Sequence, residues 1–279
     1  MRFGIHAGLW QRAWSDNPAP IMSQVKELGY RGVELSLLGV GFSDAGKLKT
    51  LSVELDLALT CSTGLGAGED PGSSDPERRT AAIRALTAAV RTAGAMGAQN
   101  LSGVVASPWG YFEPARKTER AKYASETLAQ LDGVLREEGV VLGIEALNRF
   151  ESDVTNTAAE TKAIADATES QNIGVLLDTF HMNVEEKSPS DAISETGKSL
   201  VHFHISENDR GIPGTGHFDF GASAQALSQI EYDGWVVAEM FVMAGNPASA
   251  DVNIWRNIEA DPTEAARVTL SFMQRTFSR

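Results

Sequence analysis

The chain has 279 residues, of which 42% are hydrophobic, and this is enough apolar material for a sizeable core. Its formal net charge of −13, with no run of Lys and Arg to offset it, disfavours a nucleic-acid partner. A single cysteine, Cys61, excludes an internal disulfide framework, and no apolar run approaches the ~20 residues of a membrane-spanning helix. We therefore expect a cytoplasmic protein with no membrane partner.

The chain repeats one pattern about eight times, in which a short apolar run is followed by a loop, an amphipathic helical stretch and often a glycine. Most of the runs are continuously apolar, which is typical of parallel strands covered on both faces. We expect strands at residues 2–7, 32–37, 58–62, 100–105, 140–145, 173–178, 200–205 and 235–239.

The expected helices have recognisable boundary signals. Three prolines directly follow an Asp or a Ser, as is typical of the first helical position. These are Pro76, Pro189 and Pro262. Four glycines stand between a helical pattern and the next strand, where a left-handed residue commonly ends a helix. These are Gly29, Gly97, Gly139 and Gly234.

Eight such units in a chain of this length predict a (β/α)8 TIM barrel, with residues 1–279 forming a single domain. The first turn, HAGLWQRAW, is not a GxGxxG phosphate cradle and no P-loop motif occurs, so the sequence does not indicate a nucleotide site. The stretch 64–74, GLGAGEDPGSS, follows the third strand and is expected to form a loop at the rim of the active site.

Four polar residues, Glu145, Asp178, His204 and Glu239, close the last four apolar runs in succession. The carboxyl ends of barrel strands converge on one mouth, so these side chains are expected to meet there. Three carboxylates and one imidazole suit Mn²⁺, Mg²⁺ or Co²⁺ better than a thiolate-seeking metal. The alternative is that each residue is a solitary polar group facing solvent, but four in successive strands favour one metal site.

Other polar residues near the strand ends are candidates for binding a substrate. His181, in DTFHMN, is expected in a loop, where it either contacts a substrate hydroxyl or packs within the loop. Arg210 could hold a substrate hydroxyl or be a solvated loop charge. Glu151 could orient one of these groups or lie exposed. His202 shares a strand face with His204 and is expected to be a hydrogen-bonded core group.

Aromatic residues near the expected mouth can supply the flat apolar walls that a sugar needs. They are Trp10, Trp14, Trp109, Phe112 and Phe241. Trp255, later in the chain, is expected in the core or at an interface between subunits.

The segments GIEALNRFE, LLDTFHMN, HFHISENDR, PGTGHFDF and NIWRNI together resemble the xylose isomerase-like TIM barrel family of sugar isomerases and epimerases. The likeness is to the ketose 3-epimerases in particular, which act on D-tagatose and D-allulose, and it spans nearly the whole chain.

The resemblance implies roles for individual residues. The four strand-end residues would bind a divalent metal, preferably Mn²⁺, with Co²⁺ or Mg²⁺ as alternatives, and Glu145 and Glu239 would also be the acid and base. Glu151, His181 and Arg210 match positions that contact the O1 to O3 end of a ketose. Trp109 and His6, which stands where some relatives carry an aromatic residue, complete the expected substrate-binding set. The resemblance also implies a homodimer or homotetramer.

The expected reaction is metal-dependent C3 epimerisation of a small free ketose, of the D-tagatose/D-sorbose, D-fructose/D-allulose or L-ribulose/L-xylulose type. The hydrogen on C3 lies next to the carbonyl, and two glutamates can transfer protons on opposite faces through a metal-stabilised enediolate. Alternatives on the same barrel are an aldose-ketose isomerase, an inosose dehydratase and a 3-keto-glycoside lyase. A non-catalytic sugar-binding barrel is the alternative outside enzymes.

Overall fold

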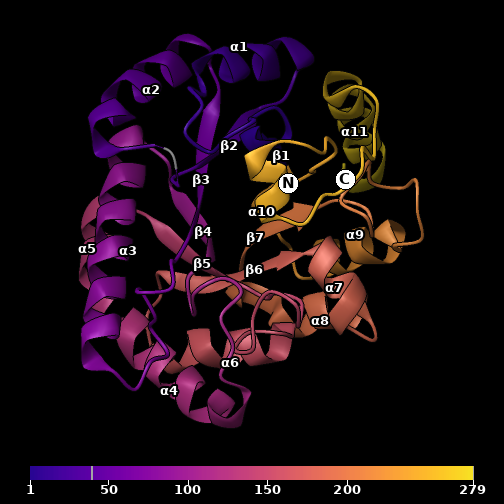
Figure 1. Ribbon diagram of the computed structural model, residues 1–279. Coiled ribbons are helices and arrows are strands. Elements are labelled where there is room, and N and C mark those ends of the chain that lie inside the picture. Colours follow the sequence, from indigo (N-terminus) through magenta and orange to yellow (C-terminus); the bar gives the residue numbers. More distant parts are fainter. Residues whose placement is uncertain (39, 279) are drawn as a thin grey trace.

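The computed structural model describes residues 1–38 and 40–278, and its strands form a closed parallel barrel (Figure 1). Neighbouring strands pair in chain order, and β8 closes the barrel by pairing with β1. The predicted (β/α)8 TIM barrel is therefore confirmed. The strands of the described chain are β1 (Arg2–His6), β2 (Gly32–Ser36), β3 (Ala58–Gly64), β4 (Asn100–Val104), β5 (Val141–Glu145), β6 (Ile173–Asp178), β7 (Leu200–Ile205) and β8 (Trp235–Ala238).

Helices surround the barrel, and each predicted strand lies within two residues of its expected bounds. The α-helices are α1 (Ala19–Leu28), α2 (Phe42–Glu54), α3 (Pro76–Met96), α4 (Lys117–Leu128), α5 (Asp132–Glu138), α6 (Ala158–Ala167), α7 (Thr179–Glu185), α8 (Pro189–Thr196), α9 (Phe220–Gln229), α10 (Pro247–Asp251) and α11 (Pro262–Phe277). Short 3-10 turns are η1 (Ala7–Leu9), η2 (Pro114–Arg116), η3 (Ala129–Leu131) and η4 (Gly197–Ser199). Along the described residues, no helix combines the length and apolarity that crossing a bilayer demands.

The helix boundaries follow the expected chemistry, with one exception. Asp75, Ser188 and Asp261 cap helices whose first residue is proline, and each side chain accepts a hydrogen bond from a backbone N–H of the first turn. Gly29, Gly97 and Gly139 adopt the left-handed conformation at helix ends. The expectation for Gly234 is wrong, because α9 ends at Gln229 and the left-handed residue after it is Glu231, with φ of 57°.

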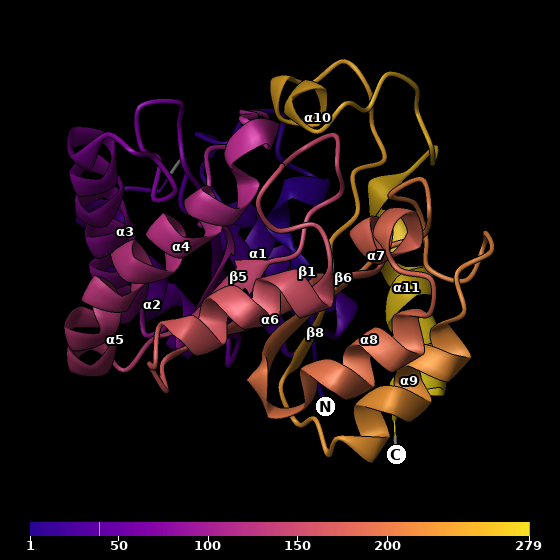
Figure 2. The same cartoon turned by 90° about the horizontal axis from the view of Figure 1, so that it is seen from below.

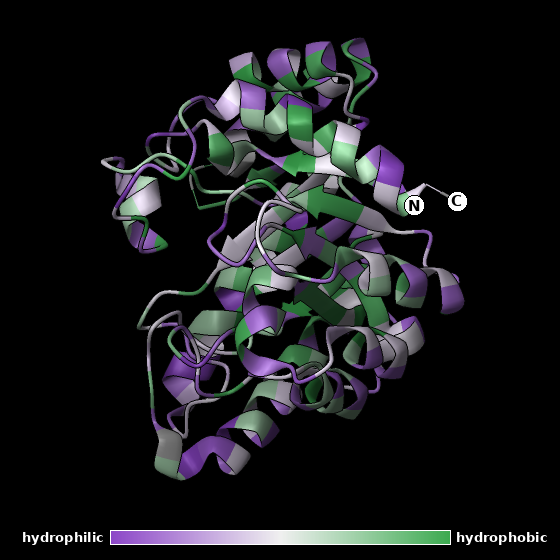
Figure 3. Ribbon diagram, turned by 90° about the vertical axis from the view of Figure 1, so that its right-hand side faces the viewer, coloured by the Kyte–Doolittle hydropathy of each residue, from purple (hydrophilic) through white to green (hydrophobic). Residues whose placement is uncertain are grey.

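The main core lies between the strands and the helices. The stripe of α3 that faces the barrel buries Leu86, Val90, Ala93 and Met96. In Figure 3 the central strands are coloured mostly as hydrophobic, whereas hydrophobic and hydrophilic residues alternate along the helices. Burial of this apolar surface is the main force that holds each helix on the sheet.

At the amino-terminal ends of the strands, the indole of Trp235 on β8 lies against Gly32 on β2. An added Cβ on Gly32 would lie 2.6 Å from this ring, so a residue larger than glycine would displace it. The opposite end is the mouth. Figure 2 shows the N-terminus at one end of the barrel and α10, which follows β8, at the other.

A buried ion cluster ties two mouth loops to α4. Arg120, only 1% exposed, donates to Asp153 Oδ1 at 2.5 Å and to Asp70 Oδ2 at 3.2 Å. Asp70 lies in the loop after β3 and Asp153 in the loop after β5, two residues beyond Glu151. The loop after β3 therefore has a fixed anchor. Its expected span of 64–74 is shortened by one residue, because β3 extends to Gly64.

Candidate active site and metal centre

Glu145, Asp178, His204 and Glu239 come together at the mouth. Glu145 and Asp178 are the last residues of β5 and β6, His204 is the last but one of β7, and Glu239 directly follows β8. Each offers one ligand atom, and these atoms all lie within 4.8 Å of one another. Three carboxylate oxygens and one imidazole nitrogen thus face a common point.

Two of these groups keep a buried polar atom without a hydrogen-bond partner among the described residues. Asp178 caps α7 through Oδ1, which accepts from the backbone N–H of Phe180 at 2.9 Å, whereas its Oδ2 has no such partner. His204 Nε2 contacts Glu34, whereas its Nδ1 has none and lies 3.6 Å from Glu239 Oε1. Orphaned buried lone pairs are costly, and a cation would satisfy both. The residues fit a divalent metal.

Burial and charge act differently on the two glutamates of this cluster. Burial raises the pKa of Glu145, and the nearby charge of Glu239 adds to that effect against the lowering influence of His181. Burial would also raise the pKa of Glu239, but His204, His6 and Arg210 outweigh it and lower the pKa. The two carboxyl groups therefore sit in unlike surroundings despite sharing one site.

Glu151 lies beside this cluster and is buried, contrary to the alternative of an exposed loop residue. Its Oε2 accepts from Trp109 Nε1 at 3.0 Å, and its Oε1 accepts from Asn148 Nδ2 at 3.0 Å and from Arg210 Nη2 at 3.3 Å. Burial would raise the pKa of Glu151, but His181 and these donors outweigh it and lower the pKa. Glu151 is thus a fixed carboxylate at the edge of the pocket.

His181 lies in α7 and not in a loop, because Asp178 caps a helix that begins at the next residue. The backbone N–H of Asn148 donates to its Nδ1 at 3.2 Å, so Nε2 carries a hydrogen. That Nε2 lies 3.4 Å from Glu145 Oε1 and 3.9 Å from Glu151 Oε2. Burial alone would lower the pKa of His181, but Glu151, Glu145 and Asp178 outweigh it, so the pKa is raised.

Arg210 is buried, so the alternative of a solvated loop charge is wrong. Its backbone is left-handed, with φ of 65°, and its guanidinium lies 4.0 Å from the centre of the Phe180 ring. Nη1 reaches Glu239 Oε2 at 3.4 Å, in addition to the contact with Glu151. The guanidinium thus joins Glu239 of the four-residue cluster to Glu151 at the edge of the pocket.

His6 forms the opposite wall of the pocket together with Ser62. Its Nδ1 accepts from the backbone N–H of Gly8 at 3.0 Å, so the neutral ring carries its hydrogen on Nε2, which lies 2.8 Å from Ser62 Oγ. Burial lowers the pKa of His6 and favours this neutral form. Since His6 donates to Ser62, the hydroxyl hydrogen of Ser62 is left to point elsewhere.

The cavity between these walls has a volume of about 320 Å³, near the lower end of the ~300–1,000 Å³ typical of small-molecule sites. It is lined by the predicted residues Glu145, Glu239, His204, Glu151, His181, Arg210, His6 and Trp109, and by Trp14, Ser36, Leu38, Ser62, Gly64, Leu65 and Phe241 among others. Leu65 and Gly66 belong to the loop predicted at the rim.

Gly64, Gly66 and Gly103 form part of this lining, and the first and last differ in how much room they leave. Gly103 has φ of 129°, and an added Cβ would collide with the carbonyl oxygen of Thr63. Gly64 has no such restriction, because the nearest atom to its added Cβ would be Val104 Cβ at 3.8 Å.

The sequence analysis missed Glu34, on β2. This carboxylate is fully buried and contacts both His202 and His204, which confirms His202 as a hydrogen-bonded core group. Burial would raise the pKa of Glu34, but the two imidazoles lower it well below its ordinary value. A charged residue in the middle of the apolar run GVELS was the signal that could have revealed it.

Comparisons with known proteins agree with this geometry. Residues 22–275 match the family described as xylose isomerase-like TIM barrel. The D-psicose 3-epimerase of Agrobacterium fabrum is 31% identical over 282 residues, which cover 98% of each chain. The L-ribulose 3-epimerase of Methylomonas sp. is 31% identical over 281 residues, covering 99% of this chain and 98% of the other. A crystal structure of D-psicose 3-epimerase in the presence of D-fructose has a TM-score of 0.95 at 30% identity, and 99% of each chain is covered.

Proposed function

This chain belongs to the xylose isomerase-like TIM barrel family and is an isomerase of the epimerase type, and we propose that it inverts C3 of small free ketoses. The observation that carries the proposal is the meeting of Glu145 and Glu239 with Asp178 and His204 within one 4.8 Å cluster. The names of the relatives, which act on D-psicose and L-ribulose, support the substrate class.

We propose that the four clustered residues hold a divalent ion, with Mn²⁺ as the preferred metal and Co²⁺ or Mg²⁺ as alternatives. The donor set of three carboxylates and one imidazole supports this choice over a thiolate-seeking metal. When bound, such an ion would polarise the ketose carbonyl and stabilise the negative charge that develops on its oxygens.

Glu145 and Glu239 transfer the protons in this proposal. They stand on β5 and just after β8, with β6 and β7 between them, so they reach the cavity from different sides. One carboxylate removes the C3 proton, the electron pair of the C–H bond forms a C2–C3 double bond, and the π pair of the C2 carbonyl moves onto O2; on protonation at C3 these electron pairs return. The other glutamate, in its protonated form, delivers its proton to the opposite face of C3. The roles are exchanged in the reverse direction.

His181, Arg210 and Glu151 orient the O1 to O3 end of the ketose. His181 presents an Nε2 hydrogen and Arg210 presents a guanidinium, both beside the two catalytic glutamates. Glu151 can accept from a sugar hydroxyl. The indole of Trp109, held by Glu151, would cover one face of the sugar. Fixed donors of this kind position the substrate without reorganisation during the reaction.

The proposal is tested with a panel of D-fructose, D-tagatose and L-ribulose in D₂O. Chelator-treated protein should leave each sugar unchanged, and added Mn²⁺ or Co²⁺ should restore interconversion with its C3 epimer. NMR and chromatography should find deuterium at C3 of the product. Loss of water would instead indicate a dehydratase, and an aldose product an aldose-ketose isomerase. Tight binding without turnover of any ketose would indicate a sugar-binding barrel.

We propose that Ser62, directed by His6, donates a hydrogen bond to the part of the ketose beyond C3. Ser62→Ala should raise KM roughly 3- to 10-fold, the usual net effect of one hydrogen bond, and leave kcat nearly unchanged. Steady-state kinetics on the best substrate of the panel provide the measurement. His6→Phe should have a similar effect, and the double variant should be little worse than either single one. An unchanged KM in Ser62→Ala contradicts this contact.

We also propose that the chain forms a homodimer or homotetramer through the mouth side. Phe150 and Trp255 are 73% and 74% exposed and line one groove, and large exposed aromatic groups are common at interfaces. The exposure of Trp255 also shows that the core alternative for this residue is wrong. Light scattering after size exclusion should give an oligomer, and Trp255→Glu should shift it toward the monomer. Val53→Glu, at an equally exposed position on α2, should not do so.

A further inference from the structure

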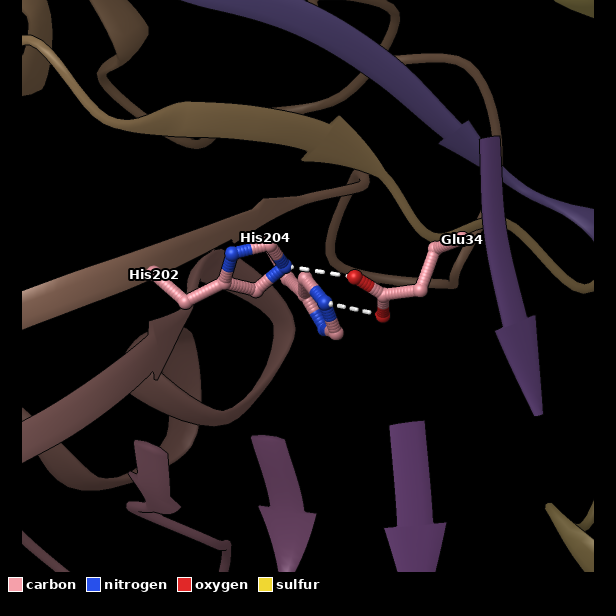
Figure 4. Close-up of side chains that lie close together, drawn as sticks. All are labelled: Glu34, His202 and His204. Carbon is pink, nitrogen blue, oxygen red and sulfur yellow. Dashed lines mark hydrogen bonds and ion pairs between the residues drawn. The ribbon is translucent and has the colours of Figure 1, made fainter. Parts of the chain in front are cut away.

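Glu34 makes hydrogen bonds with side chains from two other strands inside the barrel. Its Oε1 lies 2.8 Å from His204 Nε2, and its Oε2 lies 2.6 Å from His202 Nε2 and 2.8 Å from Thr60 Oγ1. Figure 4 shows the carboxylate of β2 facing the two imidazoles of β7 across the barrel interior. All these side chains are buried, and Glu34 and His202 are 0% exposed.

This arrangement determines which nitrogen of each imidazole carries the hydrogen. An ionised carboxylate can only accept hydrogen bonds, so Nε2 of both histidines must donate to Glu34. In a neutral ring, Nδ1 is then the atom with the free lone pair. The Nδ1 of His204 lies 3.6 Å from Glu239 Oε1, a carboxylate of the cluster that His204 forms with Glu145 and Asp178, and has no hydrogen-bond partner among the described residues.

We propose that Glu34 is the positioning residue that holds His204 in the Nε2–H tautomer and presents its Nδ1 as a metal ligand. The inference rests on the metal site of the proposed function and extends it to a residue outside the four ligands. Glu34 acts through His204 and does not face the reacting sugar. Acceptors placed behind a ligating histidine commonly fix its tautomer and ring orientation in this way.

An amide cannot replace this carboxylate without a change at the histidines. Glutamine offers one oxygen acceptor and one nitrogen donor where the two imidazoles require two acceptors. Either His202 or His204 would have to accept at Nε2, which moves its hydrogen to Nδ1, or would lose its bond. In His204, a hydrogen on Nδ1 would occupy the atom offered to the metal.

The first test is the Mn²⁺ affinity of metal-free Glu34→Gln, measured without substrate from the EPR signal of free Mn²⁺. We expect a dissociation constant about 10- to 100-fold higher than that of the unmodified protein. Thr60→Val is the matched control, because it removes the third hydrogen bond to the same carboxylate and leaves His204 paired. Its dissociation constant should stay within about twofold, since its effect on His204 is indirect. If both variants bind Mn²⁺ like the unmodified protein, the proposal is wrong.

The second test is the tautomer itself, read from long-range ¹⁵N–¹H spectra of histidine-labelled, metal-free protein at a pH where the His204 ring is neutral. His204, assigned with His204→Gln, should show a hydrogen on Nε2 and none on Nδ1. Glu34→Asp, which keeps the charge, should preserve this pattern and serves as the variant if Glu34→Gln does not fold. A neutral His204 ring with its hydrogen on Nδ1 in the unmodified protein would overturn the proposal.

The two tests separate this inference from the proposed function. If the unmodified protein binds no Mn²⁺, Co²⁺ or Mg²⁺, the metal site of the proposed function fails, while the tautomer spectra still decide the role of Glu34. If Mn²⁺ binds and the ketose panel responds, but Glu34→Gln retains full affinity and the tautomer, only the role of Glu34 fails.

Discussion

Replacement of Glu239 or Glu145 by glutamine is expected to lower kcat for ketose epimerisation by about 10²- to 10⁴-fold, the usual contribution of a positioned acid or base. Glutamine keeps an oxygen near the cluster but cannot exchange a proton at C3. The measurement is the rate of epimer formation at saturating Mn²⁺, with the bound metal determined for each variant. The exposed Glu137→Gln on α5, outside the barrel, should retain the full rate.

Deuterium exchange distinguishes proton transfer from simple metal ligation. With Glu145 changed to glutamine, Glu239 can still remove and return the C3 proton on its own face. That variant should therefore exchange deuterium into one epimer in D₂O without forming the other, and Glu239→Gln should do so with the opposite epimer. If both variants lose exchange on both epimers while retaining metal, the two-glutamate mechanism is contradicted.

Arg120→Met is expected to reduce the free energy of unfolding by about 3–5 kcal/mol, because it removes the buried cation that pairs with Asp153 and Asp70 and leaves Asp70 with only Arg78, at 4.0 Å. Urea unfolding, with reversibility verified, provides the measurement. The loss is large against a total stability of about 5–15 kcal/mol for a folded protein.

Two variants show whether this loss comes from the unpaired charges. Arg116→Met, which breaks the exposed pair with Glu119 near the same helix, should leave the unfolding midpoint nearly unchanged. Arg120→Met combined with Asp70→Asn and Asp153→Asn should recover part of the stability, because the uncompensated charges are then gone. If the triple variant is no more stable than Arg120→Met, lost packing and not charge explains the effect.

The barrel and its clustered carboxylates could be predicted because both follow from local patterns. Asp178 and His204 each stand at the end of an apolar run, and parallel strands bring such ends to one mouth. The positions of these residues along their strands therefore indicated that their side chains would meet. Tight spacing between them was not predictable, because it depends on the register between strands.

Other residues could not be placed in this way. Glu34 meets His202 and His204 across the barrel, through strands that are not neighbours, and no sequence period links them. The contacts of Arg120 join residues 33 and 50 positions away in loops whose paths depend on the whole fold. Sequence signals for individual buried ion pairs are weak for this reason.

Local signals also failed where two structures compete for one residue. His181 was expected in a loop because the apolar run ends at Asp178, but the same aspartate caps a helix. Gly234 was expected to end a helix, but α9 stops earlier and Glu231 takes the left-handed conformation in its place. In both cases the boundary moved by a few residues, and the succession of elements stayed as predicted.

Two of the glycines in the pocket wall, Gly64 and Gly103, have unequal value for laboratory evolution of sugar preference. Position 103 is closed to every other amino acid by its left-handed backbone and by the carbonyl oxygen of Thr63. Position 64 tolerates a new side chain, whose bulk would enter the cavity. A mutant library for a shorter or differently branched sugar should therefore randomise position 64 together with position 62, and keep position 103 constant.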